Sequence, residues 1–444
     1  MSREMKDTPI SGLTQIPKTW NVVPLKMLFS FSKGLSITKS DLTDEGIKVI
    51  SYGQIHSKNC DGVHATNELV RFTSDKFKSN NSLVKCGGFI FADTSEDLNG
   101  CGNAIYITDE VYGGYHTVVL NPKEAHDYRY LAYLFKTDAW RTELRKQLTE
   151  VKVFSITQFA LKNMHVILPS NEEMTQIADF LDSKCSSIDQ TIQKQKDIVN
   201  KLIEYKKSII IQAVTKGLNP NVEIKDTPIS GLTQIPKTWN VVPLKTLFSF
   251  SKGLSITKSD LTDEGIKVIS YGQIHSKSCD GVHATNELIR FTANEFKSCN
   301  SLAKCGGFIF ADTSEDLEGC GNAIYITDEV YGGYHTVVLN PKEEHDYRYL
   351  AYLFKTDAWR TELRKQLTEV KVFSITQFAL KNMHVILPSY EEMVQIADFL
   401  DSKCLKINES IERSNKIIQK LEEYKKSLIY NAVTGKIDCR GEVK

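Results

Sequence analysis

Two long stretches of the chain carry apolar residues at spacings of three and four, separated by Lys, Gln and Glu. This pattern predicts two long amphipathic helices. At about 40 residues each, such a helix extends roughly 60 Å, too long to lie on one small domain, so pairing of helix on helix is favoured. The apolar stripe of the first helix consists of Ile177, Leu181, Ile188, Leu202, Tyr205 and Ile209, and that of the second of Ile396, Leu400, Ile407, Leu421, Tyr424 and Leu428.

The middle of each stripe is polar, and polar residues at such positions fix register or partner at some cost in stability. These polar positions are Thr191 and Gln195 in the first helix and Ser410 and Ser414 in the second. Gly217 and Pro220 predict the end of the first helix, and Asn219 to Asn221 a linker.

A different pattern precedes each helix, with short β-rich runs bounded by Gly, Asp, Asn and Pro. In the first copy these runs predict strands over 47–52, 88–92, 104–107 and 117–120. Residues Tyr128 to Leu148 carry an apolar stripe at helical spacing and predict one helix. Each of these regions, here called head 1 and head 2, is therefore expected to be α+β.

The two heads are a tandem duplication. The run that begins at Lys6 recurs from Lys225, a shift of 219 positions, and the match continues with few changes through Ser170 and Ser389. The predicted organisation is head 1 over 1–170, a long helix over 171–218, head 2 over 219–389, and a second long helix with a tail over 390–444. Because the internal link between the copies matches the two ends of the chain, the ends are expected to lie near one another.

Composition narrows the class of protein. The 444 residues include 55 Lys and Arg and 55 Asp and Glu, so the formal net charge is zero, which argues against a nonspecific nucleic-acid coat but allows a local basic face. Neither a signal-peptide core nor a membrane span is visible, and the ten cysteines form no CxxC or Cys/His cluster. We expect a cytoplasmic protein with reduced thiols, no metal site and no membrane association.

The sequence motifs of several enzyme classes are missing, including the phosphate loop, a glycine-rich cofactor loop, an Asn-Pro-Pro-aromatic motif and the common hydrolase signatures. No catalytic residue is predicted. The segment Asp93 to Asp97 carries three carboxylates after a strand, which would suit a metal. The alternative is that Thr94 and Ser95 cap a turn while the acids face solvent or accept hydrogen bonds from bases.

Candidate DNA contacts gather in three glycine-rich loops and on the 128–148 helix. Lys, Ser and Thr reach phosphates, Gln and His read base edges, and glycines allow close approach of the backbone. Arg129 and Lys146 extend the basic set of the helix. The candidates of head 1 are Lys33, Ser36, Thr38, Lys39, Tyr52, Gln54, His56, Lys58, Thr94, Ser95, Tyr115, His116, Arg141, Arg145 and Lys152. Their counterparts in head 2 are Lys252, Ser255, Thr257, Lys258, Tyr271, Gln273, His275, Lys277, Thr313, Ser314, Tyr334, His335, Arg360, Arg364 and Lys371.

The order head, helix, head, helix resembles the specificity subunits of type I restriction–modification systems, over essentially the whole chain. The marks are the head start Ile16 to Leu25, the exit run from Phe154 to Pro169 with Glu172 to Ala178 after it, and the terminal segment Leu421 to Ile429 with Ala432 to Asp438. The chain departs from the family's usual double proline and Glu-Gln, having Pro169-Ser170 and Glu173-Met174 instead.

The resemblance implies a non-catalytic subunit with two target-recognition domains, each reading half of a split DNA site, and two helices pairing as an antiparallel coiled coil. It implies modification subunits as partners, which methylate adenine N6 with S-adenosylmethionine, and a motor–nuclease subunit with ATP and Mg where one is present. No cofactor is expected on this chain itself.

Because the two heads are nearly identical, we expect a gapped palindromic site. Head differences such as the run 74–76 against 293–295 would break this symmetry if they touch bases. The runner-up is a DNA-binding protein that acts without a methyltransferase, such as a regulator or an anti-restriction factor. A nuclease is disfavoured by the missing motifs, and would be revived if Asp93→Ala with Asp312→Ala abolished activity but spared DNA binding.

Overall fold

The computed structural model describes residues 3–10, 12–13, 15–57, 60–98, 100–150, 153–229, 231–276, 279, 281–317, 319–369 and 372–440. The chain forms two compact units. Unit 1 comprises residues 1–196 and 416–444, and unit 2 comprises 197–415. Each unit therefore contains one head, part of the helix that follows it and part of the other long helix, and the predicted α+β class with paired helices is confirmed.

Head 1 is built on two β-sheets. The first has the order β11-β9-β13-β4, all antiparallel, and the second the order β5-β7-β6-β12-β8. The first sheet consists of β4 (Phe29–Lys33), β9 (Phe89–Ala92), β11 (Ala104–Tyr106) and β13 (Thr117–Pro122). The second consists of β5 (Leu42–Thr43), β6 (Ile47–Ile50), β7 (Arg71–Thr73), β8 (Leu83–Val84) and β12 (Val111–Gly113). The four predicted strands are thus confirmed within a few residues.

Smaller elements connect these sheets to the helices. Three small sheets pair β1 (Met5–Asp7) with β2 (Gln15–Pro17), β3 (Asn21–Pro24) with β16 (His165–Leu168), and β15 (Phe154–Ser155) with both β10 (Thr94–Ser95) and β14 (Thr149–Glu150). The short helices are α1 (Leu25–Leu28), α2 (Tyr52–Ile55), α3 (Arg129–Phe135), α4 (Asp138–Arg145) and α5 (Gln158–Asn163).

The predicted single helix over 128–148 is two helices, α3 and α4. The chain turns at Thr137, whose hydroxyl donates to the carbonyl of Leu134 at 2.7 Å and accepts from the backbone N–H of Trp140 at 3.3 Å. A threonine that caps the next helix in this way ends the preceding one. The prediction of one helix was wrong because both segments bury apolar side chains, and their combined pattern hides the break.

Head 2 repeats this architecture with the same sheet orders. Its strands are β17 (Ile224–Asp226), β18 (Gln234–Pro236), β19 (Asn240–Pro243), β20 (Phe248–Lys252), β21 (Leu261–Thr262), β22 (Ile266–Ile269), β23 (Arg290–Thr292), β24 (Leu302–Ala303), β25 (Phe308–Ala311), β26 (Thr313–Ser314), β27 (Ala323–Tyr325), β28 (Val330–Gly332), β29 (Thr336–Pro341), β30 (Thr368–Glu369), β31 (Phe373–Ser374) and β32 (His384–Leu387). Its short helices are α7 (Leu244–Leu247), α8 (Tyr271–Ile274), α9 (Arg348–Leu353), α10 (Asp357–Arg364) and α11 (Gln377–Asn382).

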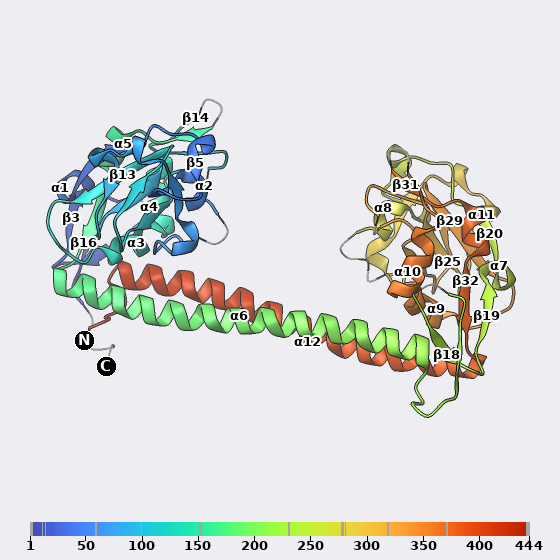
Figure 1. Cartoon of the computed structure of the whole chain (residues 1–444). Coiled ribbons are helices and arrows are strands. Elements are labelled where there is room, and N and C mark those ends of the chain that lie inside the picture. The colour runs from blue at the N-terminus through green and yellow to red at the C-terminus, as the bar shows by residue number, and fades with distance from the viewer. Residues whose placement is uncertain are drawn as a thin grey trace. The chain divides into compact units, whose positions relative to one another are not determined.

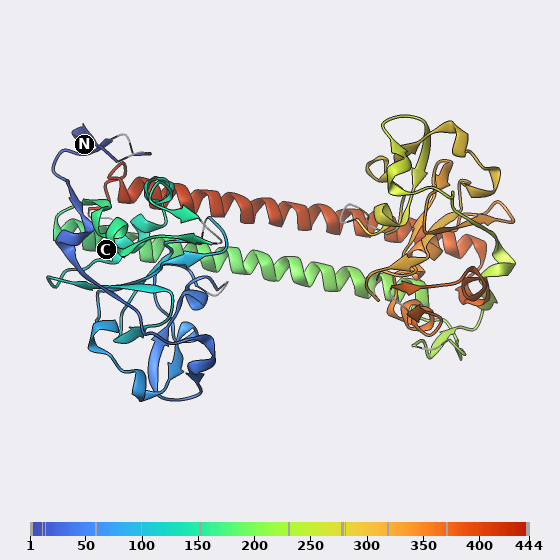
Figure 2. The same cartoon turned by 90° about the horizontal axis from the view of Figure 1, so that it is seen from above.

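The long helices are α6 (Asn171–Lys216) and α12 (Tyr390–Val433). In unit 1 the start of α6 lies beside the end of α12, below head 1 (Figures 1 and 2). Further along, Lys425 Nζ pairs with Asp189 Oδ2 at 2.6 Å, so the two helices run antiparallel there. In unit 2 Lys206 Nζ donates to Asn408 Oδ1 at 2.8 Å. As predicted, α6 ends at Gly217, which has a positive φ of 77°.

The predicted apolar stripe is correct near each head and wrong further along. Its members Ile177, Leu181 and Ile188 are buried, but Tyr205 and Tyr424 are 55% and 58% exposed. The buried positions near the end of α6 are instead Ile210, Ala213 and Val214, which join the core of head 2. An α-helix drifts by about 20° per heptad relative to a strict seven-residue repeat, so a stripe drawn with one fixed period leaves the buried face.

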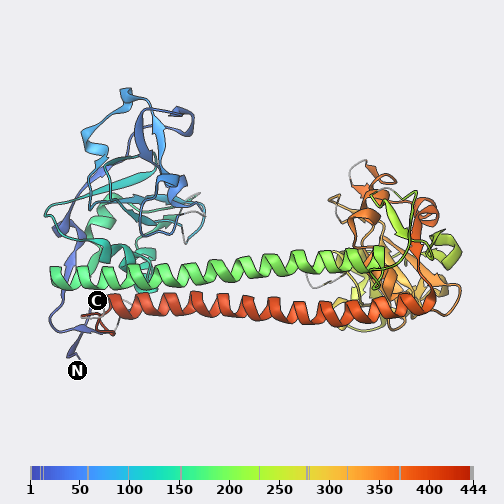
Figure 3. The ribbon, with the colours of Figure 1, turned by 60° about the horizontal axis from the view of Figure 1, so that its bottom comes forward.

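The two ends of the described chain lie together, as expected from the repeat (Figure 3). Arg3 pairs through Nη1 with Glu173 Oε1 at 2.5 Å and through Nη2 with Asp438 Oδ1 at 2.6 Å. Only 12% of the Arg3 and Glu173 side chains is exposed. One arginine thus joins the first residues of head 1 to the start of α6 and to the segment after α12.

We expect Arg3→Ala to destabilise unit 1 by about 1–2 kcal/mol, because it leaves the shielded Glu173 carboxylate without its ion pair. Chemical denaturation followed by circular dichroism measures this loss. The matched control is Lys18→Ala, which breaks an exposed pair with Glu4 and should cost less than about 0.5 kcal/mol. Equal losses for the two variants would show that the Arg3 contacts add nothing to stability.

Candidate nucleic-acid interface

Three loops far apart in sequence meet at one end of the first sheet of head 1. Backbone hydrogen bonds join them directly: Gly34 N donates to Thr117 O at 3.0 Å, Leu35 N to Gly113 O at 2.8 Å, and Tyr52 N to Tyr115 O at 3.3 Å. The three predicted glycine-rich loops therefore form one surface rather than three.

Glycine is required at this junction for steric reasons. A Cβ on Gly34 would lie 1.9 Å from the carbonyl oxygen of Gly114, and one on Gly114 would lie 2.0 Å from Ser51 Oγ. Real Cβ atoms do not approach other atoms so closely, so any larger residue would push the loops apart. The glycines thus let the three backbones pack in direct contact.

We expect Gly34→Ala to destabilise unit 1 by about 1–3 kcal/mol, since the added methyl group meets backbone that cannot move without opening the junction. Gly53→Ala is the control, because a Cβ there meets nothing within 4 Å and the residue lies in helix α2. Alanine is favoured over glycine in a helix by up to about 1 kcal/mol. Denaturation curves of both variants test the contrast, and equal stability would refute close packing at Gly34.

An aromatic and polar cluster lies at the junction, here called the Tyr52 cluster and defined by Tyr52, His56, Asp93, Tyr115 and His116. The Tyr52 ring meets the other three rings edge-on, at centroid distances of 5.7 Å to His56, 5.5 Å to Tyr115 and 5.2 Å to His116. Burial and the nearby Tyr52 raise the pKa of Tyr115 above its ordinary value. His56 is fixed from behind by a 3.1 Å contact between its Nε2 and Thr94 O.

Two members of the cluster are unusual, His116 in its backbone conformation and Asp93 in its pKa. His116 has a φ of 54°, and among the described residues it shares a positive φ outside glycine only with His335. Its Nδ1 lies 3.9 Å from Asp93 Oδ1, too far for a hydrogen bond. Burial raises the pKa of Asp93, although His116, Lys33 and a hydrogen bond from Thr94 act in the opposite direction. Left-handed backbone outside glycine is strained and concentrates at functional sites.

Head 2 carries the same cluster, formed by Tyr271, His275, Asp312, Tyr334 and His335. The ring distances are 5.8, 5.5 and 5.3 Å, the His335 φ is 55°, and His335 Nδ1 lies 3.9 Å from Asp312 Oδ1. Burial again raises the pKa of Asp312. The duplication has therefore preserved the geometry of this surface as well as its sequence.

The structure brings part of the predicted set together. Lys33 is exposed and close enough to Asp93 to lower its pKa, and Ser36 and Lys39 lie exposed on the loop that follows. Thr38 is exposed as well, but it caps a short 3-10 helix through Asp41. The corresponding exposed residues of head 2 are Lys252, Ser255, Thr257 and Lys258.

Other predicted contacts also have hydrogen-bond partners within the protein. The Gln54 side chain accepts from the backbone N–H of Ser51 at 3.0 Å, as Gln273 does from Ser270. Ser95 and Ser314 are buried and accept from backbone N–H groups two residues later, which supports the turn-capping interpretation.

Several predicted basic side chains of the α3–α4 region also have partners within the protein. Arg141 and Arg360 are partly buried and donate to the carbonyls of Cys101 and Cys320. Arg129 is held in ion pairs with Asp127, Asp179 and Asp182 and joins head 1 to α6. Arg145 and Arg364 lie in the last turns of α4 and α10. Lys58, Lys152, Lys277 and Lys371 lie outside the described residues.

Asp93 was not among the predicted contact residues, although the acids of its run were interpreted as facing solvent or accepting hydrogen bonds from bases. It stood in an acidic run, and nothing in that run distinguished it from Glu96 and Asp97. The distinguishing signal is spatial, because β9 and β13 are paired and Asp93 N donates to His116 O at 3.1 Å. Among the described residues, no group of three or more His, Cys, Asp or Glu side chains could hold a metal ion.

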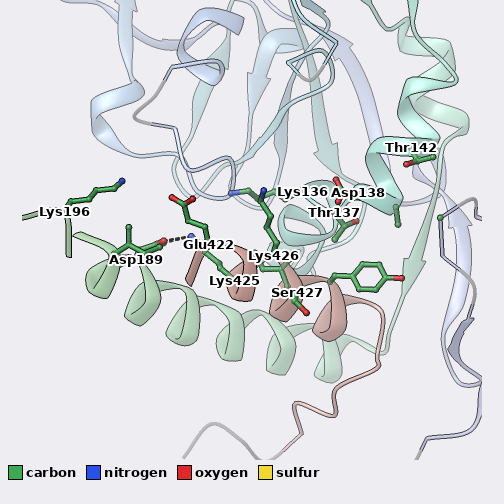
Figure 4. A pocket seen from close by; sticks show the side chains of 15 residues that line it. Lys136, Thr137, Asp138, Thr142, Asp189, Lys196, Glu422, Lys425, Lys426 and Ser427 are labelled. Atoms are coloured by element: carbon green, nitrogen blue, oxygen red, sulfur yellow. Dashed lines mark hydrogen bonds and ion pairs between the residues drawn. The ribbon is translucent and has the colours of Figure 1, made fainter. Parts of the chain in front are cut away.

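A pocket of about 740 Å³ lies on the other side of head 1, between α4 and the two long helices (Figure 4). Asp189 and Lys425 form an ion pair within it, and Glu422 and Tyr430 also line it. The corresponding pocket of unit 2 has Asn408, Ile203 and Ile211 at the positions of Asp189, Glu422 and Tyr430. The two helix-side pockets are therefore chemically unlike, whereas the loop surfaces are alike.

Comparison with known proteins identifies the family. A model of the type I restriction modification DNA specificity domain matches the chain twice, over residues 17–204 and 236–423. The chain belongs to this family. It is 27% identical over 320 residues to the type I restriction enzyme MjaVIII specificity subunit of Methanocaldococcus jannaschii, covering 69% of this chain and 70% of that protein. It is 18% identical over 430 residues to the StySPI specificity subunit of Salmonella potsdam, covering 92% and 88%.

Solved structures share the fold of this type I specificity subunit. A chain from a type I restriction–modification system aligns with a TM-score of 0.70 at 16% identity, covering 95% of this chain and 99% of that one. The HsdS subunit from Thermoanaerobacter tengcongensis aligns with a TM-score of 0.53 at 16% identity, covering 96% and 99%. DNA sequence recognition is the role of the family, so the loop surfaces of the two heads are the candidate interface with DNA. None of the helices in the described ranges is both long and apolar enough to cross a membrane.

Proposed function

We propose that this specificity subunit directs a separate methyltransferase to a bipartite, palindromic DNA sequence and carries no catalytic group of its own. The observation that carries the proposal is the preservation of the Tyr52 cluster in head 2, down to the strained histidine and its 3.9 Å distance to the carboxylate. Two surfaces with the same side chains in the same geometry read the same bases.

The docking of each head on its helices supports the palindrome. In unit 1 Trp20 Nε1 donates to Glu173 Oε2 at 2.9 Å, and Tyr130 OH donates to Val433 O at 2.8 Å. The first contact is to the start of α6 and the second to the end of α12, so head 1 holds both helices.

Unit 2 repeats both contacts with the helices exchanged. Trp239 Nε1 donates to Glu392 Oε2 at 2.9 Å, and Tyr349 OH donates to Val214 O at 2.8 Å. Each head therefore docks on the start of its own following helix and the end of the other one. The equivalent attachment of the two heads, each to one helix start and one helix end, supports half-sites of the same sequence.

One difference between the heads bears on this symmetry. Lys76 in head 1 lies near enough to Asp41 to lower its pKa, after the larger effects of the Thr38 hydrogen bonds, whereas Glu295 stands at the corresponding position in head 2. The charge reversal lies beside the loop that carries Thr38 and Lys39. Contact of this segment with bases would make the two half-sites unlike.

Membership of the family supports the proposed partners. Modification subunits would bind S-adenosylmethionine and methylate adenine N6 in the cytoplasm, and a motor–nuclease subunit, where present, would use ATP and Mg for cleavage. This chain contributes the sequence specificity, because it binds both half-sites and holds the partner at a fixed place on the DNA.

The test is a methylome. The chain is co-expressed with its neighbouring modification subunit in a host free of adenine methylation, and native DNA is sequenced for modified adenine. A gapped palindrome that appears only when this chain is present is the expected result. A motif with unlike halves would refute the equivalence of the heads, and no new motif from a soluble complex would favour the partner-independent DNA-binding protein.

A further inference from the structure

Asp93 stands out on the candidate DNA surface because it is a carboxylate. About 30% of its side chain is exposed, and among the described residues its Oδ1 atom has no hydrogen-bond partner although that atom is buried. Asp312 in head 2 is 29% exposed and its Oδ1 is likewise without a partner. Buried polar atoms in native proteins are nearly always paired, so an exception present in both heads requires an explanation.

A carboxylate on a DNA-binding surface either interacts with neighbouring cationic side chains or reads bases. Phosphates repel it, and an ionised carboxylate accepts hydrogen bonds but donates none. The donors on base edges in the major groove are the exocyclic amino groups, N6 of adenine and N4 of cytosine. The buried Oδ1 cannot be reached by such a group, so the exposed part of the Asp93 carboxylate is the acceptor that a base can contact.

The neighbours of Asp93 fit this role. Lys33 and His116 lie close enough to lower its pKa, and so favour the ionised form against the effect of burial. The His116 ring, held in its left-handed conformation between Tyr52 and Asp93, occupies the side of the carboxylate without hydrogen-bonding it. These neighbours oppose the effect of burial on the pKa of Asp93 and hold the carboxylate in place.

We propose that Asp93 and Asp312 are specificity-determining residues, each accepting a hydrogen bond from the exocyclic amino group of an adenine or cytosine in its half-site. His116 and His335 act as positioning residues for these carboxylates. The inference rests on the proposed function, since it assigns one base position within each half of the DNA site.

The single variant Asp93→Asn gives the sharpest test, because it changes one head and leaves the other as an internal reference. Asparagine keeps the shape but can donate as well as accept. In the methylome experiment, the variant is expected to relax or change one base pair in one half-site only, which converts the palindromic motif into one with unlike halves. Asp312→Asn should give the same motif, and the double variant should restore a palindrome with the relaxed position in both halves.

Asp109→Asn is the control. It removes the same charge from an exposed turn between β11 and β12, at the opposite end of β9 from Asp93, and should leave the motif unchanged. Because asparagine can still accept from an amino group, Asp93→Ala is compared as well, and methylation of the unaltered motif by both variants would overturn the inference while the proposed function stands. Absence of any motif with the wild-type chain would instead defeat the proposed function.

A second measurement tests the inference even if the substituted protein folds poorly. The wild-type complex is titrated with duplexes in which one adenine or cytosine of the motif is replaced by an analogue without the amino group. Loss of the contact at one position should weaken binding about 10- to 100-fold. The Asp93→Ala complex should show no additional loss at that position. An undiminished loss in the variant would exclude Asp93 as the reader.

Discussion

Trp20→Ala is expected to destabilise unit 1 by about 3–5 kcal/mol, the range for deleting a buried tryptophan. The Trp20 side chain has no exposed surface, packs edge-on against Tyr130 at 6.1 Å, and donates its N–H to Glu173 on α6. Gly435, just past the end of α12, also lies against its ring. The substitution therefore opens a cavity at the point where head 1 meets both helices.

Hydrogen exchange followed by mass spectrometry measures this effect separately in each unit. Peptides of unit 1, including the start of α6, should lose protection, and those of head 2 should not. Trp239→Ala is the matched variant and should show the reverse, because Trp239 occupies the corresponding place in unit 2. Uniform loss of protection in both units would show that the chain unfolds as one cooperative body, contrary to the two separate cores.

Arg129→Ala should cost about 3 kcal/mol at neutral pH, because it leaves several partly buried carboxylates without their common partner. The guanidinium lies 2.5 Å from Asp127, 2.8 Å from Asp179 and 2.6 Å from Asp182. The hydrogen bond with Asp127 is the main cause that raises the pKa of Arg129 above its ordinary value. The arginine is therefore the centre of the junction between α3 and α6.

The pH dependence identifies the cause of this loss. Burial alone would raise the pKa of Asp182. Hydrogen bonds from His64, Tyr133 and Arg129 outweigh it and lower the pKa below the ordinary 3.8. In the wild type the stabilisation from Asp182 is thus present above pH 3.8 and is lost as the pH falls through the lowered pKa.

In Arg129→Ala the carboxylates repel one another, so protonation relieves the strain. The difference in unfolding free energy from the wild type should therefore shrink as the pH falls toward 4 and below. Urea denaturation at a series of pH values measures it. Arg348→Ala in unit 2 should behave in the same way, since Arg348 binds Asp346, Asp398 and Asp401. A pH-independent difference would attribute the loss to packing of the arginine stem.

The architecture of this subunit could be predicted from sequence because its signals are repeated and periodic. The duplication predicted two like heads, and the spacing of Ile177, Leu181 and Ile188 predicted the buried face of α6. The break at Thr137 was missed because a capping hydroxyl inside an apolar stripe has no periodic signal. Tyr205 was misplaced because a stripe drawn with one fixed period drifts off the buried face along a long helix.

The candidate site was predicted in composition but not in arrangement. Tyr52, His56, Tyr115 and His116 come from loops that the sequence marked with glycines, and the structure joins them. Local hydrogen bonds decide which polar side chains of those loops remain available for contact with DNA. Gln54 and Ser95 each accept a local backbone hydrogen bond, whereas the buried Oδ1 of Asp93 has no hydrogen-bond partner among the described residues.

The sharing of both long helices between the units has a consequence for synthesis on the ribosome. The core of head 1 is completed by Leu428, Ile429 and Val433, so Ile177 and Leu181 leave the exit tunnel long before the residues that cover them. At 5–20 residues per second, about 240 residues of further translation take roughly 10–50 s. For that time the nascent chain carries an uncovered apolar helix face beside a nearly finished head. Chaperones that bind apolar nascent segments therefore have a defined target in this protein, and slow translation of head 2 would prolong its exposure.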